Sequence, residues 1–132
     1  MTFRHVTVDV PIRTVSELNR RDHHMARHRR VTVQRGVVAL VLRATLRGRP
    51  PTLPLVVRLV RVAPRDLDEG DNLAAALKAV RDQVAVEVGL PLAKMRPRQK
   101  MPVADDRDPR VSWEYAQERG DYAVRIEIRG VS

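Results

Sequence analysis

Apolar residues follow strand-like or helix-like spacing in six stretches of the chain. Phe3–Val10 alternates, with valine at every second position from 6 to 10, which is the two-residue period of a β-strand. A polar and basic stretch, residues 13–30, follows. From there to Leu46 the apolar residues recur at helical spacing and predict a helix; they are Val33, Val37, Leu40, Val41 and Ala44.

The rest of the chain predicts a strand, a helix and two further strands. Gly48 and two prolines stop the first helix, and Leu53–Val62 is a valine- and leucine-rich strand. A second helix carries an apolar stripe at a 3.6-residue period, formed by Leu73, Leu77, Val80, Val84 and Val88. Residues 111–115 and 122–128 alternate as two strands joined by a turn near Gly120. The order β-α-β-α-β-β predicts one α+β domain over residues 1–132, with a small mixed sheet and two main helices.

The composition is that of a single globular domain without a membrane-spanning segment. The chain has 132 residues, 43% of them hydrophobic, and no apolar run approaches the ~20 residues that a membrane span needs. The first ten residues lack the apolar core of a secretory signal, so we expect none. The absence of cysteine excludes disulfides, thiol catalysis and cysteine-based zinc sites, and it is typical of a cytoplasmic protein.

Positive charge is concentrated in the N-terminal half and is mostly arginine. Lys and Arg total 25 against 16 Asp and Glu, a net charge of +9. Residues 1–62 hold 13 arginines and three acids, whereas residues 63–132 hold 12 basic and 13 acidic residues. Guanidinium groups match phosphate oxygens in a bidentate geometry. The charge therefore favours nucleic acid as the partner, the alternative being a solvated surface.

Seven of the acids fall in two short clusters, which are Asp66, Asp68, Glu69 and Asp71 at the start of the second helix, and Asp105, Asp106 and Asp108 before a strand. Mg²⁺ prefers such hard oxygen ligands, and it can activate water and neutralise charge on a phosphate. The pattern indicates metal-dependent chemistry on a phosphodiester. The alternative is that Asp68 and Asp71 cap the helix and that Asp105-Asp106 forms a turn.

One face of the second helix is polar. At about 100° per residue, Asp71, Lys78 and Asp82 project away from the apolar stripe along one line. A lysine there could hold the scissile phosphate or stabilise the leaving oxygen. The alternative is an exposed Lys78–Asp82 pair worth about 0.3–0.5 kcal/mol.

Other chemistries have little support in the sequence. His24 and His28 are spaced i, i+4, but no third metal ligand accompanies them and no His-Glu-x-x-His occurs. Without Gly-x-Ser-x-Gly or a glycine-rich phosphate loop, we expect neither a serine hydrolase nor a nucleotide cofactor. Aromatic residues, at 3%, leave little for base stacking and favour recognition of the duplex backbone. Residues 91–104 predict a basic loop that is either solvated or in contact with DNA.

The order of these motifs resembles the RusA-type Holliday junction resolvases, in particular their phage-borne branch. The resemblance covers nearly the whole chain, including the loop-into-helix region around Leu18-Asn19-Arg20. It lies mainly in Pro64–Asp68 leading into Asp71-Asn72-Leu73, in Lys78–Asp82, in Asp105-Asp106, in Asp108-Pro109-Arg110 and in Trp113–Gln117.

The resemblance implies a homodimeric, Mg²⁺-dependent endodeoxyribonuclease that cuts four-way DNA junctions by paired nicks, in DNA recombination and repair. It implies that Asp71, Lys78 and Asp106 are catalytic, with Asp71 and Asp106 holding the metal. Asp105, Glu69 and Asp68 are further candidate ligands. The family commonly has Asp-x-Asp-Asn, whereas here Glu69 stands two residues before Asp71, and Asp68 could fill that role instead.

Two further features complete the expectation. The spacing from Asp71 to Lys78 is about one helical turn longer than in compact members of the family, and the basic loop 91–104 resembles an insertion. We expect the DNA backbone to meet the arginines of the N-terminal half, namely Arg20, Arg21, Arg27, Arg29 and Arg30. The alternatives are a non-catalytic basic nucleic-acid-binding domain, or an interaction protein whose binding would be insensitive to salt.

Overall fold

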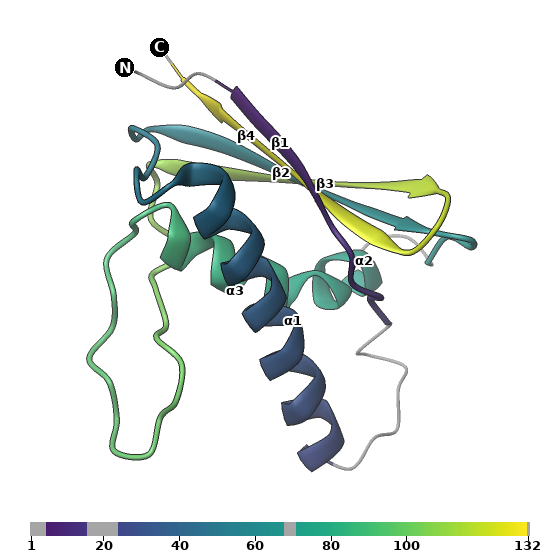
Figure 1. The fold of residues 1–132 in the computed structure, drawn as a ribbon, viewed down its shortest axis with the longest axis horizontal. Coiled ribbons are helices and arrows are strands. Elements are labelled where there is room, and N and C mark those ends of the chain that lie inside the picture. Colours follow the sequence, from purple (N-terminus) through teal and green to yellow (C-terminus); the bar gives the residue numbers. More distant parts are fainter. Residues whose placement is uncertain (1–4, 16–23, 68–70, 132) are drawn as a thin grey trace.

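The described residues fold into a mixed four-stranded sheet with three helices (Figure 1). The computed structural model describes residues 5–15, 24–67 and 71–131, and it describes only the backbone of Asp71. The elements are β1 (His5–Val10), α1 (His24–Leu46), β2 (Leu55–Ala63), α2 (Asp71–Ala76), α3 (Lys78–Glu87), β3 (Val111–Arg119) and β4 (Ala123–Gly130). The predicted α+β class and β-α-β-α-β-β order are confirmed, with the second helix divided in two at Leu77.

The sheet places the two ends of the chain side by side. Its strand order is β1-β4-β2-β3; β2 and β3 run parallel, and the other pairs are antiparallel. The central strands β4 and β2 are the most deeply buried, and their register pairs Val57 with Ile128. The parallel pair needs a crossover, and α2 and α3 supply it.

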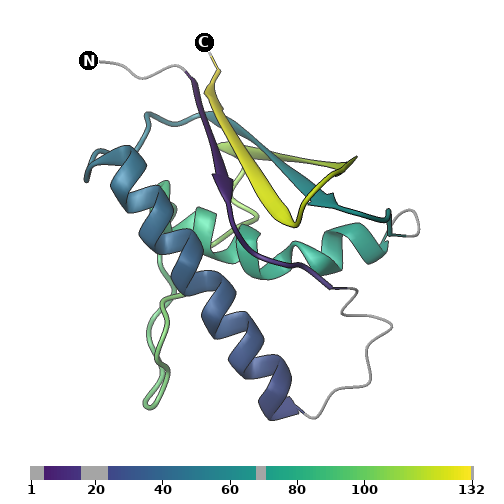
Figure 2. The same ribbon diagram turned by 45° about the vertical axis from the view of Figure 1, so that its right-hand side comes forward.

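Only one face of the sheet is covered by helices (Figures 1 and 2). That face contributes the alternating residues of β2 and β4 to the core, where Leu59, Val80 and Ile126 are fully buried. The opposite face carries cross-strand ion pairs, for example Arg125 with Asp9 at 3.1 Å and with Glu118 at 2.9 Å. One-sided coverage explains the alternation of apolar and polar residues that marked β1 and β4 in the sequence.

Helix α1 begins earlier than predicted and buries a different face. It starts at His24, within the stretch we expected to be polar and irregular, and its first six residues are exposed. The apolar spacing that predicted the helix does not mark its buried side, because Val33 is 64% exposed and Leu40 is 72% exposed. The residues it buries are Gln34, Arg35, Val38, Ala39 and Leu42.

Two polar residues can be buried on α1 because other elements satisfy them. Gln34 Nε2 donates to the carbonyl of Arg13 at 3.3 Å. Arg35 Nε donates to Gln83 Oε1 at 3.0 Å, and Arg35 Nη2 donates to the carbonyl of Pro102 at 2.6 Å. Arg35 therefore ties α1 both to α3 and to the loop that precedes β3.

The basic loop 91–104 forms an arm that leaves the body of the molecule. In both ribbon views it projects to the same side of the sheet as the N-terminal half of α1 (Figures 1 and 2). Its two sides are joined near the base by an isolated bridge between Leu92 and Ala104. The predicted loop is thus confirmed as irregular chain. Among the described residues no helix is both long enough and apolar enough to cross a membrane.

Candidate active site

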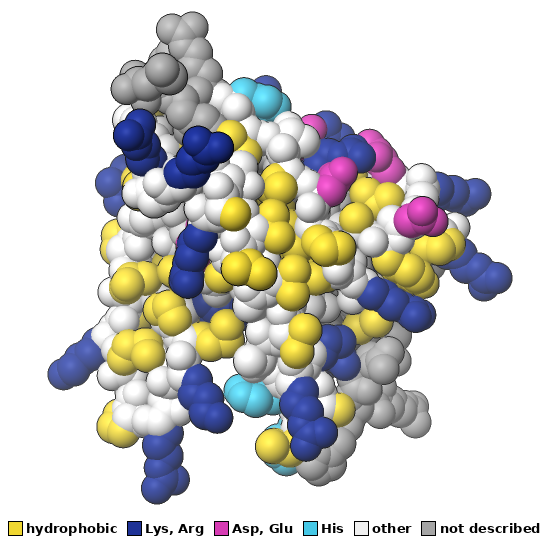
Figure 3. Space-filling model, viewed as in Figure 1, with side chains coloured by type: hydrophobic (Ala, Val, Ile, Leu, Met, Phe, Trp, Pro, Cys, Tyr) yellow, Lys and Arg dark blue, Asp and Glu magenta, His cyan; other side chains and the backbone are white. Residues whose placement is uncertain are grey.

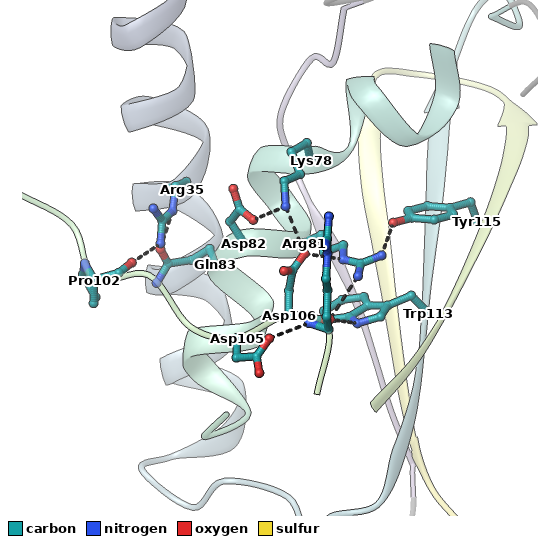
Figure 4. Close-up of polar contacts among 11 residues, drawn as sticks. Arg35, Lys78, Arg81, Asp82, Gln83, Pro102, Asp105, Asp106, Trp113 and Tyr115 are labelled. Carbon is teal, nitrogen blue, oxygen red and sulfur yellow. Dashed lines mark hydrogen bonds and ion pairs between the residues drawn. The ribbon is translucent and has the colours of Figure 1, made fainter. Parts of the chain in front are cut away.

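The structure brings together two of the three predicted catalytic residues. Lys78 is the first residue of α3, and Asp106 lies 28 residues later in the segment before β3. Lys78 Nζ is 2.9 Å from Asp106 Oδ2 and 2.8 Å from Asp82 Oδ1 (Figure 4). The Lys78–Asp82 pair anticipated on the helix therefore exists, but it is part of a larger group that reaches into another element.

The break at Leu77 sets the position of Lys78. Leu77 is fully buried, with φ −99° and ψ 4°, and its N–H is shared between the carbonyls of Leu73 at 3.1 Å and Ala74 at 3.2 Å. The helical path continues, because Arg81 N donates to Leu77 O at 2.9 Å. The apolar stripe stays in the core, where Leu77, Val80 and Val84 are fully buried, and Lys78 faces outward as predicted.

Arg81 fixes Asp106 in place, and the sequence analysis did not identify it. Its Nε donates to Asp106 Oδ2 at 2.7 Å, and its Nη2 donates to the Asp106 carbonyl at 3.0 Å. Its Nη1 donates to Tyr115 Oη at 2.8 Å, and its guanidinium carbon lies 4.7 Å from the centre of the Trp113 ring. Trp113 Nε1 also donates to the Asp106 carbonyl at 2.8 Å. Residue 106 is therefore held from both α3 and β3.

The surroundings of Lys78 and Asp106 favour the charged form of both side chains. Partial burial acts to lower the pKa of Lys78, but hydrogen bonds and charge from Asp82 and Asp106 outweigh it, and the pKa lies above its ordinary value. Burial acts to raise the pKa of Asp106, but Lys78 and Arg81 outweigh it and lower that pKa. At neutral pH Lys78 is a cation and Asp106 a carboxylate, so neither is suited to exchange protons there. Their chemistry at this pH is electrostatic.

Lys78 stands between two adjoining hollows. One, of about 420 Å³, is lined by Lys78, Arg81, Asp106 and Tyr115 among others. The other, of about 280 Å³, lies between α1 and the helices α2 and α3, and its lining includes Arg27, Lys78 and Asp82. We call the two together the Lys78 cleft. An anion entering either side meets the Lys78 ammonium group.

Of the carboxylates predicted to hold a metal, the structure describes the side chains of Asp105 and Asp106 only. The Oδ2 atom of Asp106 takes the bonds from Lys78 and Arg81, and within the described residues its other oxygen makes no hydrogen bond. Asp105 is exposed, and its Oδ1 accepts from the Arg107 N–H at 3.1 Å, which is the turn role considered as the alternative. Asp71 begins α2, but its side chain lies outside the described residues, as do Asp68 and Glu69.

The carboxylate oxygens of Asp105 and Asp106 are of the chemical type that a hard cation binds. Free carboxylate oxygens remain at Asp105 and Asp106, and oxygen is what Mg²⁺ prefers. Among the side chains that the structure describes, no three His, Asp or Glu gather closely enough to hold a metal ion. Within the described side chains, the two positive charges of Lys78 and Arg81 offset the two negative charges of Asp82 and Asp106. Binding of Mg²⁺ would therefore need further carboxylates, such as those predicted at residues 68, 69 and 71.

The acidic segment is anchored to β3 by a residue that the sequence analysis did not identify as functional. Gln117 Oε1 accepts from the Leu67 N–H at 2.8 Å, and Gln117 Nε2 donates to the Leu67 carbonyl at 3.1 Å. These two hydrogen bonds fix the backbone of Leu67, which stands between Asp66 and Asp68 of the acidic cluster. No local sequence signal marks Gln117 or Arg81, because their partners come from distant parts of the chain.

The predicted DNA-contacting arginines fall in different places. Arg27 lines the Lys78 cleft. Arg29 and Arg30 line a separate hollow of about 400 Å³ together with Arg13. Arg20 and Arg21 lie outside the described residues. His24 and His28 are both exposed on the first turns of α1.

No protein-family model matches the chain, and a comparison with curated proteins finds no similar sequence.

Proposed function

We propose that this chain is a RusA-type, Mg²⁺-dependent crossover junction endodeoxyribonuclease that resolves four-way DNA junctions by paired phosphodiester nicks. The observation that supports this most is the 2.9 Å contact between Lys78 Nζ and Asp106 Oδ2 across 28 residues of sequence. Both residues belong to motifs that the sequence alone identifies. Their meeting at a cleft is what a shared phosphate site requires.

In this proposal the residues of the cleft act by charge and position. Lys78, a cation at neutral pH, contacts the scissile phosphate as a point charge and stabilises the leaving oxygen. Asp106 is a carboxylate whose direction is fixed by Arg81. A phosphate that enters the cleft competes with Asp82 and Asp106 for the Lys78 ammonium group. Phosphate binding is therefore coupled to the ion pairs that Lys78 forms with these two carboxylates.

The metal belongs to the proposal. Asp71 and Asp106 would hold Mg²⁺, with Asp105, Glu69 and Asp68 as further ligands. When bound, Mg²⁺ supplies a water of lowered pKa and neutralises charge developing on the phosphate. Gln117 contributes by holding Leu67, within the acidic cluster, against β3.

The charge distribution supports a DNA substrate. On the face seen in Figure 3, carboxylates gather at one end over the sheet with Lys and Arg side chains beside them, and further Lys and Arg side chains spread over the rest of the face. Arg27 lines the cleft beside Lys78, where it can meet a phosphate next to the one that is cut. Arg29 and Arg30 extend the basic surface of α1, with Arg20 and Arg21 proposed to continue it.

A homodimer is the second part of the proposal, since a junction must be cut on two strands. Two exposed apolar residues of α1, Val33 and Leu40, support it because large exposed apolar groups at helical spacing suit a helix–helix contact. A cytoplasmic location completes the proposal, because the DNA of the bacterial cells in which phage-borne enzymes act lies there. Leu40→Glu should produce monomers in analytical ultracentrifugation, and a monomeric wild type would contradict the proposed homodimer.

The decisive experiment is incubation with an end-labelled synthetic four-way junction, with and without Mg²⁺. We expect symmetric nicks on two opposing strands, dependent on the metal. Asp106→Asn should reduce the cleavage rate at least about hundredfold, the loss typical of a missing electrostatic group in an active site. Asp121→Asn makes the same chemical change in the exposed turn before β4 and should cleave normally.

The same cleavage experiment also distinguishes the proposed nuclease from the main alternative, a non-catalytic binding domain. A non-catalytic binding domain would bind the junction and give no nicks under any metal condition. Junction binding by Asp106→Asn, measured alongside, verifies that the variant is folded. Equal cleavage by the Asp106 and Asp121 variants would remove the Lys78–Asp106 pair from the mechanism.

A further inference from the structure

A second basic hollow adjoins the Lys78 cleft at Val31 and lies between the arm and the N-terminal half of α1. It has a volume of about 540 Å³. His28, Thr32 and Arg35 of α1 form one wall, and the turn of the arm from Arg96 to Met101 forms the other. We call it the arm groove. It shares Val31 with the Lys78 cleft, and none of the charged residues that line that cleft.

The arm is held in a defined shape. At its base, Ala93 N donates to Val103 O and Asp105 N donates to Pro91 O, both at 2.8 Å. At its tip, Gln99 N donates to Arg96 O at 3.1 Å and Gln99 Oε1 accepts from Arg96 N at 3.1 Å. Arg35, which is only 5% exposed, bonds the Pro102 carbonyl and thereby fixes the arm to α1. A prearranged groove loses less conformational entropy when it binds a ligand.

The cations of the arm lack internal partners. The 14 residues 91–104 contain four basic residues and no acid. Within the described residues, none of Lys94, Arg96, Arg98 and Lys100 forms an ion pair, whereas Lys78, Arg81, Arg110 and Arg125 each do. Among the described residues that line the groove there is no carboxylate and no Phe, Tyr or Trp ring. Such a lining fits an anionic backbone and not stacked bases.

We infer that the arm groove binds the sugar–phosphate backbone of a duplex DNA arm, next to the site of cleavage. This inference rests on the proposed function and extends it. Lys100 stands six positions before Asp106, so this arm cation lies within about 20 Å of chain from the Lys78 cleft. At 3.4 Å per step, that length corresponds to about six base pairs. One duplex arm can therefore reach both places.

The test compares two triple variants of equal charge. One carries Arg96→Ala, Arg98→Ala and Lys100→Ala in the arm groove. The control carries Arg47→Ala, Arg49→Ala and Arg129→Ala, and Arg47 lies about 28 Å along α1 from His28. Binding to a fluorescent four-way junction is titrated without divalent metal at several salt concentrations.

We expect the arm variant to reduce the slope of log affinity against log salt by about 3, since each lost phosphate contact removes about 1. At ~0.1 M salt its affinity should fall roughly 10- to 1000-fold, and the control should retain most of the wild-type slope. Shortening the junction arms below about six base pairs should abolish the difference between the arm variant and wild type.

Two results would overturn the inference. An arm variant with the wild-type slope would mean that the groove serves another partner, such as an acidic protein. Equal losses in both triple variants would mean that net charge alone is being measured. Cleavage is scored separately: if the wild type binds with the arm-dependent slope but gives no Mg²⁺-dependent nicks, the proposed nuclease is refuted and the groove assignment stands.

Discussion

The network around Arg81 provides the sharpest test of how the candidate site is held together. Arg81 makes three hydrogen bonds, to Asp106 Oδ2, to the Asp106 carbonyl and to Tyr115 Oη, and lies over the Trp113 ring. Its side chain is only 20% exposed. The perturbation is Arg81→Met, which keeps an unbranched apolar stem over Trp113 and removes the guanidinium group.

The expected cost follows from the bonds lost. A hydrogen bond to a carboxylate contributes about 1.5–3 kcal/mol and the contact with the Trp ring about 0.5–1 kcal/mol. The two bonds to neutral oxygens add little beyond this, because water can replace them at a half-buried site. We expect a total near 3 kcal/mol in the free energy of unfolding, which lowers the melting temperature by about 11 °C for 132 residues.

Lys78→Met is the matched comparison, because Lys78 donates to the same oxygen of Asp106. Its side chain is 57% exposed, so the loss should be below about 1 kcal/mol. Urea unfolding followed by circular dichroism measures both variants, with fluorescence of Trp113 as a second probe. If Arg81→Met unfolds at the wild-type midpoint, or costs less than Lys78→Met, the assignment of Arg81 as the anchor of Asp106 is wrong.

Three further predictions concern the core, the pH dependence and the acidic segment. In urea unfolding at a protein concentration low enough to keep the chain monomeric, Leu42→Ala should cost about 2–5 kcal/mol and Leu40→Ala less than about 0.5 kcal/mol, because Leu42 is fully buried and Leu40 is 72% exposed in the single chain; equal costs would contradict the orientation of α1. The pKa of Asp106 is lower in the folded state, so its carboxylate stabilises the fold fully above the unfolded-state pKa of ~3.9, and this stabilisation is lost as the pH falls through the folded-state pKa. The free energy of unfolding of Asp106→Asn should therefore fall less steeply with acid below about pH 4 than that of the wild type. Parallel pH profiles for the two proteins would contradict this prediction. Gln117→Ala should raise the Mg²⁺ concentration needed for half-maximal cleavage, because the chain at Leu67 loses its two bonds to β3; an unchanged metal titration would show that this anchor does not act on the site.

The sequence by itself determined the local elements. Strands with one solvent-facing side must alternate, and the outward face of β4 does carry the charged residues that interrupt its apolar ones, such as Arg125 and Glu127. The stripe from Leu77 to Val84 predicted the buried side of α3 correctly, because that helix packs with an ordinary apolar face. It also placed Lys78 and Asp82 on the exposed side, where they form the expected pair.

Only the tertiary structure decided which side of α1 is buried and what surrounds Asp106. Gln34 and Arg35 are buried because Arg13, Gln83 and Pro102, from three other parts of the chain, supply their hydrogen-bond partners. Arg81 could not be distinguished from the other arginines, since its role depends on Tyr115 and Asp106, 34 and 25 residues away. Periodicity reports how one segment divides between water and core, whereas the burial of a polar group depends on partners that only the folded chain brings within hydrogen-bonding distance.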